Sequence, residues 1–280
     1  MAISPVPNWL RIILILLSFA SFLPQLRLLW QRRDSSGISL YYVLFNLISA
    51  TEEFTLSFFW VVNSFEPSDV FVNKPPNAGD WLNFVQFSLV WVLWLAIFIA
   101  CLTYPSDNDR PGQRYKVIAI YVSYLLISII PLLIDALNVN GREDEYRSWA
   151  GAVFSFVHSQ FAIPIITILC IAAFFAQAKT IRARDNPGAL SKTGLAVQAV
   201  VFAFIAIAWI GRLGFPWDKV DEFGPSLGLL TYWYQWVGWV TVDSAIFAVA
   251  QGVLFWLTSR HQRGVGADAV GGETEPLLRG

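Results

Sequence analysis

Three acidic side chains lie inside long apolar segments of this 280-residue chain: Glu52 and Glu53 midway along one segment, and Asp243 midway along another. A charged side chain at membrane depth is costly, so each is a candidate functional residue. Burial favours the protonated form of a carboxylic acid, and such a group can carry a proton or bind a cationic solute. Neighbouring helical residues point about 100° apart, so we expect one of the two glutamates to line a cavity and the other to face an adjacent helix.

Two other ionisable residues lie in apolar segments. Asp135 is near the end of its segment, and we interpret it as interfacial. His158 has Ser155, Ser159 and Gln160 as polar neighbours, and we interpret it as a hydrogen-bonded packing residue. These residues and two isolated cysteines have no metal-ligand spacing, so we expect no metal or other cofactor.

The composition indicates which elements position these groups. The chain is 56% hydrophobic and 14% charged, whereas soluble domains are about a quarter charged. A bilayer-spanning helix needs roughly 20 apolar residues. Seven segments meet that test, so the predicted fold is an all-α membrane protein with seven transmembrane helices, at residues 9–30, 39–62, 81–103, 117–138, 150–177, 190–211 and 230–257.

The distribution of basic residues predicts the orientation of the chain. With the N-terminus outside, 13 of the 19 lysines and arginines lie on the cytosolic side and 6 on the other. Cytosolic loops carry the excess of these residues. We therefore expect a luminal N-terminus and a cytosolic C-terminus.

An internal repeat relates the two halves of the chain. A shift of 152 residues lays QLRLLWQRRDSSGIS (25–39) over QAKTIRARDNPGALS (177–191) without a gap, so that Gln25 meets Gln177 and Ser39 meets Ser191. Each copy ends one span with basic residues, turns, and starts the next span at a serine that can cap it. The repeat predicts two parallel three-helix bundles joined by a linker helix (3+1+3), with boundaries at 1–103, 104–149, 150–257 and a disordered cytosolic tail at 258–280.

The same shift places Asn46 opposite Gln198. Paired amides at equivalent heights can bind a polar solute on the axis between the repeats. Hydrogen bonding between helices is the competing interpretation.

The first copy resembles the PQ-loop repeat family. The residues that carry the resemblance are Leu23-Pro24-Gln25, the basic turn, and Gly37-Ile38-Ser39. The family includes the lysosomal cystine exporter cystinosin, vacuolar cationic amino-acid exporters and the related SWEET sugar transporters. The resemblance implies transport of a small polar, amino-acid-like solute, with Pro24, Gln25 and Gln177 at hinges where the bundles rock. The second copy has Ala176 in place of proline, which puts a symmetric hinge in doubt, although Pro164 can bend the same span elsewhere.

Other classes fit the chain less well. A seven-helix receptor shares the span count, but no Asp-Arg-Tyr-like triplet follows the third span, and a retinal protein needs a lysine that segment 230–257 lacks. With two histidines and no catalytic cluster, we expect no enzyme, and we expect no nucleic-acid partner. A non-transporting sensor or accessory protein of the same fold remains an alternative.

The C-terminal tail contains a sorting pattern. Glu273 stands four positions before Leu277 and Leu278, and this resembles the acidic dileucine signal that cytosolic adaptors read on the way to lysosomes and vacuoles. We therefore expect a vacuolar or lysosomal membrane location, with lipid, protons, a small solute and sorting adaptors as partners.

Overall fold

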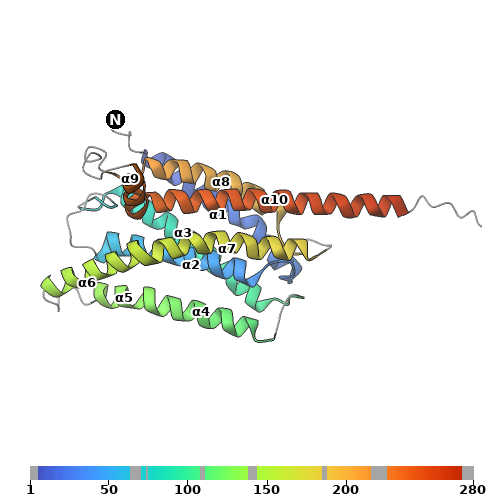
Figure 1. Cartoon of the computed structure of the whole chain (residues 1–280), viewed down its shortest axis with the longest axis horizontal. Helices are drawn as coiled ribbons and strands as arrows, with labels where there is room; N and C mark the ends of the chain where they lie inside the picture. Colours follow the sequence, from blue (N-terminus) through green and yellow to red (C-terminus); the bar gives the residue numbers. More distant parts are fainter. Residues whose placement is uncertain are drawn as a thin grey trace, which may run out of the picture.

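The protein is described by a computed structural model that covers residues 6–63, 71–73, 75–107, 111–137, 144–184, 188–215 and 226–272. Within these ranges the regular structure is helical throughout (Figure 1). The α-helices are α1 (Asn8–Arg32), α2 (Leu40–Phe58), α3 (Ala78–Thr103), α4 (Gln113–Ser128), α5 (Ile130–Leu137), α6 (Asp144–Val157), α7 (Ile163–Arg182), α8 (Lys192–Ile210), α9 (Ser226–Trp233) and α10 (Trp239–Gly272). Three π-helical turns accompany them: Phe59–Asn63 extends α2, His158–Ala162 joins α6 to α7, and Tyr234–Gly238 joins α9 to α10.

Six helical stretches of the described residues are long and apolar enough to cross a membrane: Asn8–Arg32, Ala78–Thr103, Gln113–Leu137, Trp149–Arg182, Lys192–Ile210 and Gly228–Arg260. The sequence predicts a seventh span at 39–62, which is α2 and its π-helical turn. This helix is less hydrophobic because it contains Asn46, Glu52 and Glu53. It is also an interior helix, with 14 of its 19 residues buried.

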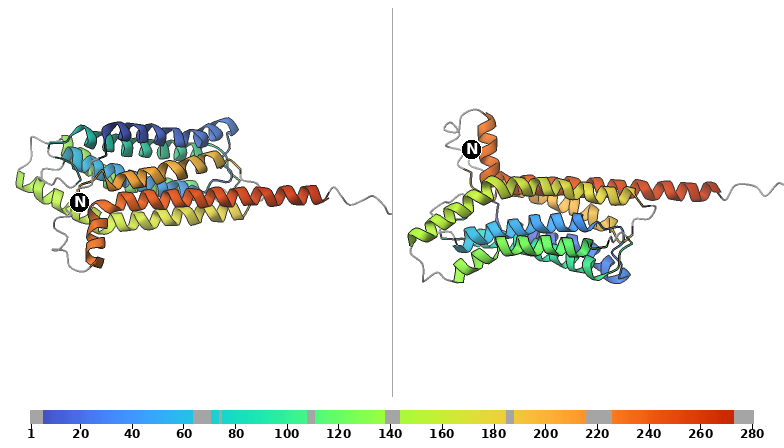
Figure 2. Two further views of the ribbon diagram at one scale, coloured as in Figure 1. Left: turned by 90° about the horizontal axis from the view of Figure 1, so that it is seen from above. Right: turned by 60° about the horizontal axis from the view of Figure 1, so that its bottom comes forward.

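The helices pack in a pattern that the 152-residue shift relates. Helix α3 contacts both α1 and α2, and α10 contacts both α8 and α7. Across the middle of the molecule, α1 packs on α8 and α2 packs on α7, while α4 lies against α2 (Figures 1 and 2). The shift carries α2 onto α8 residue for residue, because Leu40 and Phe58 move to positions 192 and 210.

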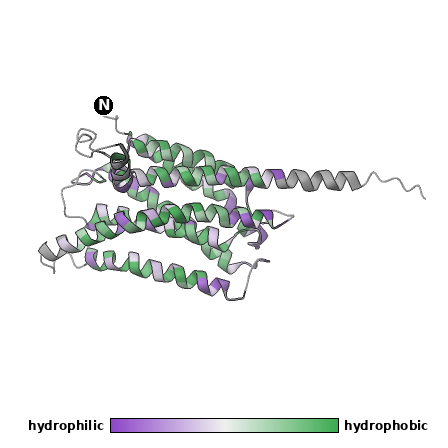
Figure 3. Ribbon diagram, viewed as in Figure 1, coloured by the Kyte–Doolittle hydropathy of each residue, from purple (hydrophilic) through white to green (hydrophobic). Residues whose placement is uncertain are grey.

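Apolar side chains cover the outer surface as well as the core. Figure 3 shows hydrophobic residues along the length of the helices and hydrophilic ones mainly toward their ends. On the outside, Trp30, Ile168, Phe175, Ile207 and Val249 are all more than 60% exposed. Such a surface suits the hydrocarbon region of a bilayer, so the chain is a multi-pass membrane protein.

Residues 33–39 and 188–191 meet at one end of the bundle, which we call the basic end. Ser39 and Ser191 cap α2 and α8 by accepting hydrogen bonds from the backbone N–H groups of Tyr42 (3.4 Å) and Gly194 (3.0 Å). Gly188 has a positive φ of 62°, and a Cβ there would lie 2.1 Å from the Ser36 carbonyl oxygen. Only glycine therefore fits where the two loops touch.

Two helices differ from the expectations. The sequence predicts a disordered tail from residue 258, but α10 continues as helix to Gly272 and extends past the bundle (Figure 1). Helix α1 runs unbroken through Pro24. Figure 2 shows two changes of direction, one between α6 and α7 and a sharper one between α9 and α10, each at a π-helical turn. The first lies next to Pro164, which has no N–H to donate to the carbonyl group of Gln160.

Candidate functional site

A carboxylate pair lies where α2, α7 and α10 come together. Asp243 of α10 is 3% exposed, and its carboxyl group interacts electrostatically with that of Glu53 on α2. The thiol of Cys170 on α7 lies close to both acids and donates a hydrogen bond to the Ser49 hydroxyl (3.3 Å). We call Glu53, Asp243 and their hydroxyl neighbours Thr167 and Tyr234 the central site.

The hydrogen bonds of the central site have one consistent direction. The Thr167 hydroxyl donates to Asp243 Oδ1 at 2.5 Å. It lies 2.6 Å from the Tyr234 hydroxyl. Because threonine has a single O–H, which goes to Asp243, the Tyr234 hydroxyl must donate to Thr167. This chain uses only Oδ1.

The second oxygen of Asp243 is left open. Oδ2 is buried and has no hydrogen-bond partner among the described residues. A buried, unsatisfied polar atom in a native structure calls for an explanation such as a bound proton, water or ligand. The central site can therefore accept a proton or a cationic group from outside the chain.

Glu52 points elsewhere, as the angular spacing of adjacent helical residues predicts. Its two carboxylate oxygens contact the Tyr124 hydroxyl of α4 and Nδ1 of His158 in the π-helical turn, and Glu52 is 1% exposed. The His158 ring also stacks on Phe154, with centroids 3.9 Å apart. Glu52 thus ties α2 to α4 and to the bend between α6 and α7.

Two glutamines hold the basic end closed. Gln25 Nε2 donates to the Ala189 carbonyl oxygen (2.9 Å), and its Oε1 accepts from the Ser191 N–H (2.8 Å). Gln177 Nε2 donates to the Gly37 carbonyl oxygen (2.8 Å), and its Oε1 accepts from the Ser39 N–H (2.9 Å). Each contact maps onto its counterpart under the 152-residue shift. We call this reciprocal set the amide clamp.

The loops are joined directly as well. The Ala189 N–H donates to the Ser36 carbonyl oxygen at 2.7 Å. Deeper in the bundle, Tyr42 of α2 and Gln251 of α10 share hydrogen bonds of 2.9 and 3.1 Å. These polar contacts between segments far apart in sequence close the molecule at this end.

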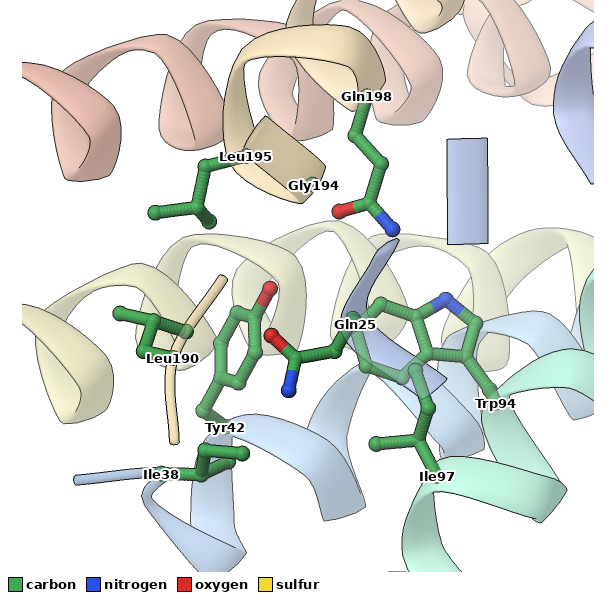
Figure 4. A pocket seen from close by; sticks show the side chains of 9 residues that line it. All are labelled: Gln25, Ile38, Tyr42, Trp94, Ile97, Leu190, Gly194, Leu195 and Gln198. Atoms are coloured by element: carbon green, nitrogen blue, oxygen red, sulfur yellow. The ribbon is translucent and has the colours of Figure 1, made fainter. Parts of the chain in front are cut away.

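A small cavity of about 10 Å³ lies beside the clamp, with room for one water molecule. Gln25, Tyr42, Trp94 and Gln198 line it, as Figure 4 shows, together with aliphatic residues. Asn46, the predicted partner of Gln198, instead donates to the Tyr42 carbonyl oxygen of its own helix (2.7 Å). Within the described residues no hydrogen bond joins Asn46 to Gln198, and a shared solute site for the two amides stays a prediction.

Two arginines are buried at the opposite end of the bundle: Arg11 in α1, and Arg212 just after the end of α8. Arg11 Nη1 donates to the Gly79 carbonyl oxygen (2.9 Å) and to Asn83 Oδ1 (2.8 Å). Arg212 Nη1 donates to Gln86 Oε1 (2.5 Å). Burial, and secondarily the charge of Arg11, lower the pKa of the Arg212 guanidinium to about 9. Both arginines belong to the six basic residues on the side opposite the cytosol, and the sequence does not predict their burial, because it depends on the packing of α1, α3 and α8.

The remaining predicted residues fall in three groups. Asp135 accepts a hydrogen bond from Asn63 (3.0 Å) near the end of α5, consistent with a position close to an end of the bundle. Glu273, Leu277 and Leu278 lie outside the described residues. Tyr124, Thr167 and Tyr234 are site residues that the sequence analysis misses, because hydroxyl groups in apolar helices are common and only packing shows which ones meet an acid.

The sequence profile described as "PQ loop repeat" matches residues 6–69, which include α1, the first basic loop and α2. Residues 6–69 therefore carry a PQ-loop repeat. The resemblance drawn from Pro24, Gln25 and the Gly37-Ile38-Ser39 turn is thus confirmed.

The chain is also similar to cystinosin from Bos taurus. The two sequences are 30% identical over 155 residues, which cover 52% of this chain and 38% of the bovine protein. The match thus spans less than half the length of that relative.

Proposed function

We propose that this PQ-loop protein is a membrane transporter for a small polar, amino-acid-like solute. The observation that carries the proposal is the central site, where Asp243 presents an open, buried oxygen beside Glu53 at the junction of α2, α7 and α10. Ionisable groups in this position mark ion and solute paths in membrane proteins. The similarity to cystinosin supports the same reading.

The chemistry of the central site favours a solute with an amino group, or a proton that travels with the solute. Two carboxyl groups close together repel each other when both are charged, so one of them readily takes up a proton or a cation. A proton bound at Asp243 Oδ2 neutralises one of the two acids and leaves the other to bind the amino group of the solute, so proton and solute move together. We expect Asp243 and Glu53 to carry the coupled proton. Glu52 is a further acid nearby, but its carboxylate oxygens contact His158 and Tyr124.

The transport movement that we propose is a rocking of two three-helix repeats. One repeat consists of α1, α2 and α3, the other of the bent α6–α7 helix, α8 and the α9–α10 helix, with α4 and α5 as the linker. Opening toward the basic end requires the amide clamp to break. Because the clamp is symmetric, both repeats release the same pair of backbone groups.

The proposed location is a vacuolar or lysosomal membrane with the basic end in the cytosol. The excess of basic residues on that side and the Glu273 to Leu278 pattern support it. The solute then moves from an acidic lumen to the cytosol, and cytosolic adaptors bind the tail.

Uptake into proteoliposomes tests the function. Purified protein is reconstituted and radiolabelled amino acids are screened with and without an inward proton gradient. We expect the proton gradient to stimulate uptake of at least one amino acid. In the Asp243→Asn variant, the gradient is expected not to stimulate uptake of that amino acid. The exposed substitution Gln235→Ala is the matched control and retains coupling. Absence of uptake for every amino acid and sugar tested, from protein that is folded by thermal unfolding, would rule out the transporter and leave the sensor or accessory role.

A further inference from the structure

Two adjoining hollows lie on the outer surface of α7. The first, of about 340 Å³, lies between α7 and α10 and is lined only by apolar side chains, among them Ile171, Ala245, Ile246 and Val249. Val249 is 66% exposed, so this groove opens toward the surrounding membrane.

The second hollow, of about 460 Å³, continues toward the basic end. It is lined by Phe174, Phe175, Ala178, Lys179, Arg182 and Ala183. Phe174 borders both hollows, so an apolar groove leads to a pocket with two cations. Lys179 and Arg182 are three residues apart and therefore share a face of the helix.

The charges of Lys179 and Arg182 are not used by the part of the chain that the structure describes. Both side chains are exposed, and no hydrogen bond or ion pair joins either of them to a described residue. Neighbouring arginines of the basic end do have such partners. Arg184 pairs with Asp107, and Arg114 donates to the carbonyl oxygens of Leu102 and Tyr104 at 2.8 Å each.

We propose that this surface is a binding site for an anionic phospholipid. One acyl chain lies in the groove between α7 and α10, and the phosphate lies between Lys179 and Arg182. The distance along α7 from Ile171 to Lys179 is about 12 Å at the usual helix rise, which is enough for the upper half of an acyl chain. Lipid tails are the solvent at this surface, and the cations select a negatively charged headgroup.

The first repeat does not have two basic residues at the corresponding positions. The 152-residue shift places Arg27 opposite Lys179 but Trp30 opposite Arg182. The site is therefore expected on the second repeat alone, which gives the experiment an internal control at Arg27.

The test uses spin-labelled lipids and the whole protein reconstituted in phosphatidylcholine. Electron paramagnetic resonance measures the fraction of labelled phosphatidic acid or labelled phosphatidylcholine that the protein immobilises. We expect preference for phosphatidic acid, reduced about fivefold by Lys179→Gln or Arg182→Gln, since each basic residue near a headgroup contributes on that scale. Arg27→Gln is expected to leave the preference unchanged.

Two further arms identify the source of the preference. Val249→Trp, which fills the groove from the exposed side, is expected to weaken phosphatidic acid binding without removing either cation. Inorganic phosphate at millimolar concentration is expected not to displace the labelled lipid. Equal loss with Arg27→Gln would show a general charge effect, and displacement by phosphate would show a free-anion site. Either result, or an unchanged preference in Lys179→Gln/Arg182→Gln, would overturn the proposal.

Discussion

Gln25 and Gln177 each satisfy one N–H and one C=O group of the opposite loop, and no water is needed to do so. Both glutamines are buried, at 8% and 0% exposure. A side-chain amide is suited to this because it offers a donor and an acceptor in one plane. The glutamine of the motif therefore has a structural role in this chain that does not depend on the proline before it, and Ala176 leaves that role intact.

Removal of one clamp glutamine is expected to destabilise the closed form. Gln177→Ala leaves the Ser39 N–H and the Gly37 carbonyl group without partners, and each buried group left unsatisfied costs about 1–3 kcal/mol. We expect a lower midpoint of thermal unfolding in detergent. Gln235→Ala, which removes an exposed glutamine pair, serves as the control and should shift the midpoint little. Equal midpoints for the two variants would contradict the clamp.

Thr167 is expected to matter through Asp243. Thr167→Val keeps the shape of the side chain but removes the only described donor to Asp243 Oδ1. With that donor gone, the charged form of Asp243 loses support, so coupling of uptake to the proton gradient should shift toward higher pH. The pH profile of uptake by Thr167→Val measures this. Thr180→Val is the matched control because Thr180 bonds only to its own helix, and a profile equal in both variants would remove Thr167 from the site.

At the residue scale, the sequence identifies the acidic residues of the site but not the side chains that contact them. Apolar surroundings identify Glu52, Glu53 and Asp243, and the spacing of adjacent helical residues correctly separates the directions of the two glutamates. The partners Tyr124, His158 and Thr167 come from helices remote in sequence, and only their packing makes them neighbours. The Asn46 amide bonds to the backbone one turn earlier, a local contact that the repeat spacing does not reveal.

At the element scale, the bend between α6 and α7 is one of two departures from straight helices, the other being the bend between α9 and α10 (Figure 2). The π-helical turn His158–Ala162 is followed directly by α7, with Pro164 as the second residue of α7. The sequence identifies Pro164 as a possible kink but does not predict the π-helical turn before it, in which His158 contacts Glu52 of α2. The capping ability of serine predicts that helices begin after Ser39 and Ser191, and α2 and α8 begin there.

Pro164→Ala is expected to straighten this helix. The new N–H can donate to the Gln160 carbonyl group, which favours a regular α-helix. In a straight helix the 19 residues from Phe156 to Phe175 span about 28 Å. Spin labels at these two positions should therefore give a longer distance in Pro164→Ala than in the parent protein, while Ile165→Ala as the control should not change it. An unchanged distance would mean that the Glu52 contact alone sets the bend.

The Asp107–Arg184 ion pair links the loop before α4 to the end of α7, outside the membrane spans. The hydrogen bond from Arg184 holds the pKa of Asp107 below its usual value. The pair therefore stabilises the fold above the ordinary carboxyl pKa, and this contribution is lost as pH falls through the lower, folded value. Because Asp107 is half exposed, the effect is small.

Thermal unfolding between pH 3 and pH 7 checks this pair. Arg184→Gln is expected to lower the midpoint slightly at pH 7 and by less at pH 3, where part of the stabilisation by the ion pair is already lost. Lys116→Gln is the control, because Lys116 is an exposed basic residue in the first turn of α4. An equal deficit of Arg184→Gln at both pH values would show that Arg184 acts by packing.

At the scale of the whole molecule, the contacts of α3 with α1 and α2 match those of α10 with α7 and α8, and the two sets of helices meet at the basic end. The repeat spacing predicts this relation, and the equivalence of α2 and α8 agrees with it. What the spacing does not reveal is that each half clamps the loop of the other, because reciprocal contacts depend on how α1 packs on α8 and α2 on α7. The proposed transport cycle depends on breaking and remaking these contacts.

A reversible cross-link between the two loops tests that cycle most directly. The Ala189 N–H bonds to the Ser36 carbonyl oxygen, so Ser36→Cys with Ala189→Cys places two thiols at neighbouring backbone positions. Each single variant is the control, and uptake of the solute found by the proteoliposome screen is measured before and after reduction. The account predicts no uptake when the loops are cross-linked, and recovery on reduction to the level of the single variants. Full uptake by protein that is shown to be cross-linked would contradict it.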